Sequence, residues 1–140
     1  MSTSLNQLVY PKTAPDDLRG PLEAACREGG TSFFNNGADP GFGSDLIPLT
    51  LLALMDEIES VRVQEIVNYK HYDQAWVMRD LFGFGQPLDH VAPLFTSGAL
   101  TEYWGGVVTM VADALGLELD EIRETHDVAA VDHDVETAIG

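Results

Sequence analysis

The stretch that decides how this chain folds is NNGADPGFGSDLIPLTLLALMDEIESVRVQE, residues 35–65. Its first part, residues 35–45, contains two Asn, three Gly, one Pro and two Asp, all of which favour loops. An apolar run follows at residues 46–55, and an alternating run follows at residues 61–70. A loop between two regular elements is either a plain connection or a site that its neighbours hold in place. The sequence on both sides of the loop bears on this choice.

The residues after the loop predict a helix and then a strand. Residues 45–59 are apolar on almost every side of a helix, which is typical of a buried helix. Ser44 or Asp45 can cap its first turn, and Pro48 then falls where a missing N–H group costs little. Residues 61–70 alternate between two faces and therefore predict a strand.

The residues before the loop predict a helix and a short strand. The helix covers residues 15–28, with acidic residues in its first turn and Gly29-Gly30 after its last turn. Gly20-Pro21 interrupts this span, and the sequence leaves open whether one helix or two short ones result. The segment TSFFN, residues 31–35, predicts a brief buried strand. Together these elements read as the second half of a β-α-β unit.

The last half of the chain predicts two more helices and a strand. A helix is expected at residues 74–82, an irregular link at residues 88–99 and a long helix at residues 101–115. Residues 125–140 then predict a strand. Because neither chain end is marked by turn residues, we expect that both ends cut through secondary structure.

Composition narrows the classes of partner. The 140 residues include 7 basic and 23 acidic residues, for a formal net charge of -16. Such a surface repels phosphate backbones and anionic lipid, so we expect neither nucleic-acid nor membrane binding. The apolar run at residues 46–55 is too short to span a bilayer. The single cysteine, Cys26, cannot form an internal disulfide, which fits a cytoplasmic location.

Two segments in order carry a resemblance to a known family. FFNNGADPGFGSDLIPLTL is followed by VRVQEIVNYKHYDQAWVMRDLFGFG. This order resembles the dihydrodipicolinate-reductase-like NAD(P)-dependent oxidoreductases, and most closely their 2,4-diaminopentanoate dehydrogenase and amine dehydrogenase branch. The resemblance extends over nearly all of the chain.

The resemblance implies a fold of the α/β and α+β classes. Residues 1–40 would be the end of a Rossmann-type doubly wound sheet, and residues 41–140 a truncated α+β domain that binds substrate and forms oligomers. The whole enzyme would transfer a hydride between NADP or NAD and a small amine, imine or cyclic imine, and it would be a homo-oligomer. The chain has no G-x-G-x-x-G turn for the pyrophosphate, so we expect these 140 residues alone to be inactive.

The resemblance also implies which residues face the ligands, although it identifies no catalytic residue in this chain. The residues expected near the cofactor are Thr3, Ser4, Asp39, Pro40, Gly41 and Phe42. Those expected near the substrate are Asp45, Tyr69, His71 and Tyr72. The resemblance favours the loop as a site over a turn that buries Phe42 in the core. Asp39 stands where the family has Asn, so the amide contacts of that side chain do not carry over.

Some readings stay open at this point. Tyr69 and Tyr72 suit either a pocket wall or an ordinary aromatic strand end. Glu65 could attract an amine or pair with Arg62 or Arg79. The chain could also serve as a non-catalytic ligand-binding or oligomerisation module.

A metal site is not expected. The segment HDVAAVDHD, residues 126–134, has carboxylates and imidazoles, but alternation directs Asp132 and Asp134 to one side and His133 to the other. Zinc requires ligands that converge on one point.

Overall fold

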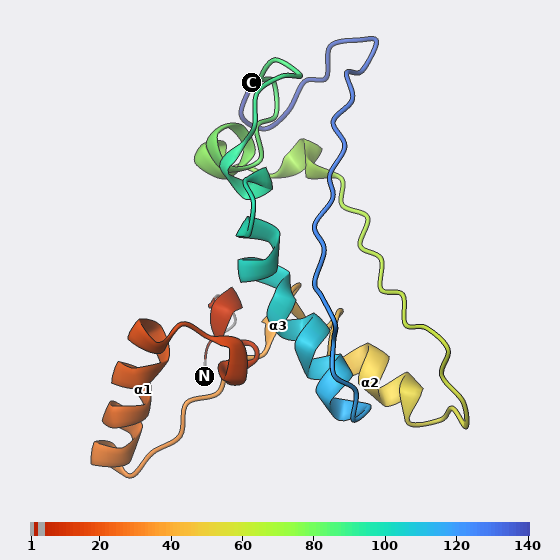
Figure 1. Cartoon of the computed structure of the whole chain (residues 1–140). Coiled ribbons are helices and arrows are strands. Elements are labelled where there is room, and N and C mark those ends of the chain that lie inside the picture. The colour runs from red at the N-terminus through yellow and green to blue at the C-terminus, as the bar shows by residue number, and fades with distance from the viewer. Residues whose placement is uncertain (1, 3–4) are drawn as a thin grey trace. The chain divides into compact units, whose positions relative to one another are not determined.

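The computed structural model of the chain describes Ser2 and residues 5–140 (Figure 1). Thr3 and Ser4, expected near the cofactor, lie outside the described residues. The chain divides into two compact units, Met1–Gln64 with Thr101–Ile122 and Glu65–Leu100 with Arg123–Gly140. Nothing tests the predicted domain boundary at residue 40, which stays a prediction. No helix among the described residues has both the length and the apolar character to cross a membrane.

Helix α1, Asp16–Gly29, forms as one uninterrupted helix through Pro21. Asp16 and Asp17 lie in its first turn, where negative charge is favourable. Its C-cap residue, Gly30, has φ 57°, and the N–H of Thr31 donates to the carbonyl of Cys26 at 2.9 Å. This is the left-handed cap that Gly accepts without steric cost. The predicted helix is therefore confirmed, and Gly20-Pro21 does not divide it.

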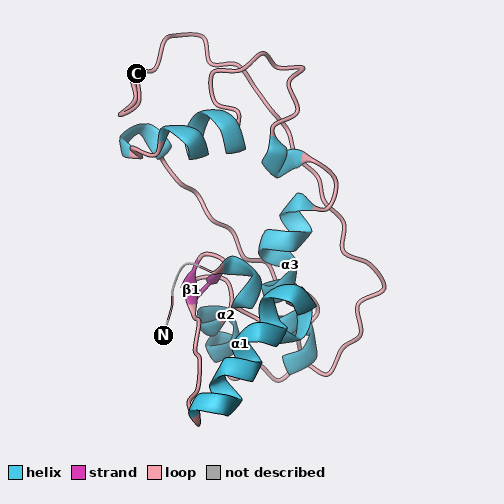
Figure 2. Ribbon diagram, turned by 90° about the vertical axis from the view of Figure 1, so that its left-hand side faces the viewer, coloured by secondary structure: helices cyan, strands magenta, loops and turns pink. Residues whose placement is uncertain are grey.

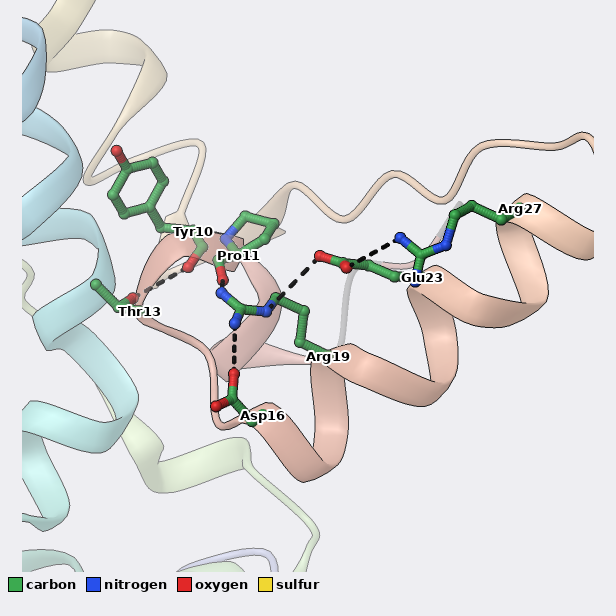
Figure 3. A network of polar contacts seen from close by, with 7 residues as sticks. All are labelled: Tyr10, Pro11, Thr13, Asp16, Arg19, Glu23 and Arg27. Atoms are coloured by element: carbon green, nitrogen blue, oxygen red, sulfur yellow. Dashed lines mark hydrogen bonds and ion pairs between the residues drawn. The ribbon is translucent and has the colours of Figure 1, made fainter.

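A row of charged side chains runs along α1 (Figure 3). Arg19 pairs with Asp16 and with Glu23, and Glu23 also pairs with Arg27 at 3.4 Å. Arg19 Nη1 also donates to the carbonyl of Pro11 at 3.1 Å. Exposed pairs at this spacing add only a few tenths of a kcal/mol each, about 0.2–0.5. The ion pairs therefore stabilise α1 only slightly, and the hydrogen bond from Arg19 to Pro11 connects the helix to the segment before it.

Ser2 and Asn35, which precede and follow α1 in the sequence, form a parallel bridge. The N–H of Ser2 donates to the carbonyl of Phe34 at 2.9 Å, and the N–H of Asn36 donates to the carbonyl of Ser2 at 3.3 Å. Two parallel segments joined through a helix are the connection of a β-α-β unit. The rest of the predicted strand at residues 31–35 has no ladder among the described residues.

Helix α2, Leu46–Leu52, is shorter and more exposed than the sequence predicts. The N–H groups of Leu54 and Met55 donate to carbonyls only three residues back, which tightens and ends the helix. Leu46 is 53% exposed and Leu51 is 53% exposed. The expectation of a buried helix to residue 59 was wrong for this chain, since no described element covers its apolar side.

The two longer strands expected at residues 61–70 and 125–140 do not form among the described residues. Figure 2 shows strand β1, Gly37–Ala38, as a short magenta segment within loops. An alternating sequence becomes a strand only when a neighbour supplies ladder hydrogen bonds. The α/β and α+β class as a whole stays a prediction.

The first unit has its core around the middle of α3, Ala99–Ala114. Two 3-10 helices, η1 (Asn6–Leu8) and η2 (Pro11–Thr13), belong to the same unit. Gly106 of α3 allows a close approach, because a Cβ there would lie 3.1 Å from Oγ1 of Thr13. The buried apolar residues of this unit are Leu8, Val9, Ala14, Val107 and Ala112.

The second unit is built from short helices. They are the 3-10 helices η3 (Tyr69–His71) and η5 (Pro93–Phe95) and the π-helix η4 (Trp76–Leu81). The predicted helix at residues 74–82 is thus present with π geometry. Its buried apolar residues are Val77, Met78, Ala92 and Leu94.

Candidate functional site

The loop that follows the parallel bridge is held in a tight fold by two glycines. Strand β1, Gly37–Ala38, bridges back onto Gly41. Gly37 has φ 59° and Gly41 has φ 140°, values that side chains rarely adopt. A Cβ at Gly41 would lie 2.1 Å from the carbonyl oxygen of Asn36, and one at Gly37 would lie 2.0 Å from that of Pro40. The loop therefore needs Gly at both positions.

The tip of this loop packs into the first unit. Pro40 is fully buried, and the peptide bond that joins it to Asp39 is cis. A Cβ at Gly37 would also meet the Cγ2 of Val9 at 3.0 Å, so the loop lies against the segment between η1 and η2. Asp39 itself is half-buried. The predicted cofactor residues Asp39, Pro40, Gly41 and Phe42 thus lie in one loop, in which Pro40 and Gly41 are buried and Phe42 is exposed.

The end of the loop turns directly into α2. The carbonyl of Gly41 accepts the N–H groups of Ser44 at 2.9 Å and Asp45 at 2.7 Å. The side chain of Asp45 accepts the N–H of Leu46, so Asp45 is the cap of α2, and Ser44, the alternative that the sequence left open, is not. Asp45 is only 9% exposed. Burial raises the pKa of its carboxyl, and the bond from Leu46 partly offsets that rise.

Phe42 lies on the surface and is not a core residue. Its side chain is 50% exposed. It lines a shallow apolar groove of about 200 Å³ on the side of α2, together with Leu46, Ile47, Thr50 and Leu51. The alternative in which Phe42 belongs to the core of the chain is therefore wrong. An exposed aromatic ring next to a glycine loop can stack on a flat ligand or pack against another protein surface.

Two amide oxygens at the start of the loop are buried without a donor. Asn35 is 7% exposed, and its Nδ2 donates to the carbonyl of Leu5 at 2.9 Å. Its Oδ1 and the Oδ1 of Asn36 have no hydrogen-bond partner in the structure as described. Buried polar atoms normally have one.

The predicted substrate residues are divided between the two units. Asp45 belongs to the first unit, whereas Tyr69, His71 and Tyr72 belong to the second. The ring of Tyr69 makes edge-on contacts with Tyr72, with centroids 5.7 Å apart, and with Phe82 at 5.2 Å. His71 is exposed. Tyr69 and Tyr72 therefore pack in an aromatic cluster, and a role in substrate binding stays a prediction for all three.

The histidines of the C-terminal segment have other contacts. His126 stacks on Phe95 with centroids 4.8 Å apart. The Nδ1 of His133 lies 2.6 Å from the Oδ1 of Asp132. The expectation that strand alternation would point these two side chains to opposite sides was therefore wrong. The segment is not a strand, and neighbouring side chains can turn toward each other. Among the described residues, no group of three or more His, Cys, Asp or Glu side chains could hold a metal ion.

Comparison with known proteins gives two relatives. The chain is 45% identical over 137 residues to an amine dehydrogenase from Streptomyces virginiae, and the aligned region covers 98% of this chain and 38% of that protein. It is 24% identical over 119 residues to a 2,4-diaminopentanoate dehydrogenase from Acetoanaerobium sticklandii, and the aligned region covers 84% of this chain and 33% of that protein. No family model matches the chain, and no solved structure matches it.

The chain thus spans well under half the length of both relatives. Their names are those of the branch that the sequence resembles. The wider resemblance to dihydrodipicolinate reductases stays a prediction.

The structure points to residues that the sequence pattern did not single out. They are Asn35 and Asn36 at the start of the loop and Phe82 and Phe84 in the aromatic cluster. Two successive amides directly after Phe33 and Phe34 were a usable signal, because polar side chains at the end of an apolar segment often face a ligand. Nothing in the sequence pattern indicated the ring contacts.

Proposed function

We propose that the protein that carries this chain is a nicotinamide-dependent oxidoreductase that acts on a small amine, imine or cyclic imine. The observation that carries the proposal is the 45% identity with the Streptomyces amine dehydrogenase over 137 residues. The diaminopentanoate dehydrogenase adds a second relative whose named substrate also carries amino groups. The whole reaction, its substrate and its preference for NAD or NADP belong to the proposal.

The proposed architecture has the end of a Rossmann-type sheet followed by an α+β domain. The parallel bridge between Ser2 and Asn35 supports it, because α1 then takes the place of a crossover helix between two parallel strands. In such sheets, ligands bind at the carboxyl ends of the strands. The loop from Gly37 to Phe42 follows the second paired segment directly.

In this proposal, the loop binds the nicotinamide end of the cofactor. A bound nicotinamide would supply the hydride acceptor or donor for chemistry at the carbon that bears the amine. The tight turns at Gly37 and Gly41 set the shape of the loop, and the exposed ring of Phe42 would lie beside the nicotinamide as an apolar wall. Thr3 and Ser4 remain proposed hydrogen-bond donors to the same end of the cofactor.

Asp45 is the proposed anchor for the cationic amine. Its carboxyl is buried, and burial disfavours its charged form, as the raised pKa indicates. A nearby ammonium group would relieve that penalty and hold the substrate against the loop. For Tyr69, His71 and Tyr72, a role in substrate binding is proposed from the resemblance alone.

Self-association is part of the proposal and has an observation of its own. The groove on α2 presents Phe42, Leu46, Ile47 and Leu51 as an exposed apolar strip. Apolar strips of this kind favour contact with another protein surface. A homo-oligomer, or in the alternative a non-catalytic module that binds through this strip, would cover it.

The test uses the complete gene product that carries these 140 residues. It is incubated with NAD or NADP and a panel of small primary amines that includes 2,4-diaminopentanoate, and the absorbance of reduced nicotinamide is followed. Amine-dependent reduction, lost in Gly41→Ala and kept in Gly43→Ala, supports the proposal. A folded product that reduces neither cofactor with any amine, yet associates through α2, would favour the non-catalytic module.

A further inference from the structure

No further inference is drawn: the strongest candidate, the exposed apolar strip that Phe42, Leu46, Ile47 and Leu51 form along α2, carries nothing beyond the self-association already proposed, because nothing among the described residues shows which surface covers it.

Discussion

Lys12 and Asp113 lie 2.6 Å apart, from Nζ to Oδ2, and join η2 to the last turn of α3. Tyr10 Oη donates to the same carboxylate oxygen. The two contacts lower the pKa of Asp113, with the bond from Lys12 as the larger cause, and raise those of Lys12 and Tyr10. The three residues link positions about a hundred residues apart in the chain.

Stability of the first unit should therefore depend on pH at both extremes. Because the pKa of Asp113 is lower in the folded chain, its contribution is present above the ordinary value of 3.8 and is lost as pH falls through the lowered pKa. The pKa values of Tyr10 and Lys12 are raised from 10.0 and 10.5, so their contribution is lost as pH rises through the raised values. Thermal unfolding across pH measures both limits.

The variant Asp113→Asn should unfold at lower temperature at neutral pH and show a flatter pH profile. Asp120→Asn is the control, because Asp120 is exposed in the segment after α3. If both variants gave the same profile as the unchanged chain, the contact would add nothing to stability.

The tight loop should tolerate alanine at Gly43 but not at Gly41. At Gly41 the backbone alone costs about 1–3 kcal/mol for a side chain, and a Cβ would also collide with the carbonyl of Asn36. At Gly43 the nearest atom would be 3.5 Å away, an ordinary contact, so we expect a change within about 0.5 kcal/mol. Denaturant unfolding compares the two, and equal stabilities would show that the loop relaxes freely.

Phe42→Ala should weaken function more than folding. Truncation of a buried Phe lowers the free energy of unfolding by about 3–5 kcal/mol. Because Phe42 is 50% exposed, its truncation should lower that free energy by much less. Leu94→Ala, at a position that is 6% exposed, is expected to lose about 2–5 kcal/mol. A large loss of stability with normal turnover in the complete gene product would contradict the role proposed for Phe42.

Asp45→Asn should separate stability from amine binding. Asn is as good a helix cap as Asp, and the change removes a buried charge, so stability at neutral pH should be kept or rise. The pKa of Asp45 is raised in the folded chain, so its carboxyl stabilises the fold less as pH rises and the group becomes charged. The gain in stability from Asp45→Asn should therefore be larger at neutral than at acidic pH. Calorimetry should show at least about tenfold weaker amine binding. Unchanged amine affinity would leave Asp45 as a cap alone.

The 140-residue chain should associate in solution at moderate salt. The apolar strip on α2 drives contact, and salt screens the repulsion between copies that carry a net charge of -16. The double variant Leu46→Gln, Leu51→Gln should shift light scattering toward the 15.2 kDa monomer, whereas Ile66→Gln, exposed in the second unit, should not. A single monomer peak for the unchanged chain at all concentrations would rule out this association.

The sequence by itself determined the local elements whose hydrogen bonds and caps are supplied nearby. Helix α1 with its Gly30 cap, the glycine loop before α2, the Asp45 cap and the helix α3 follow from residues within a few positions of one another. Tertiary structure decided what depends on distant neighbours. The alternating residues 61–70 have no partner strand among the described residues, so they form no strand and end in the 3-10 helix η3, and the apolar face of α2 stays exposed. The buried oxygens of Asn35 and Asn36 likewise appear only when the chain packs around them, because a pattern of residues does not show which polar atoms lose their contact with water.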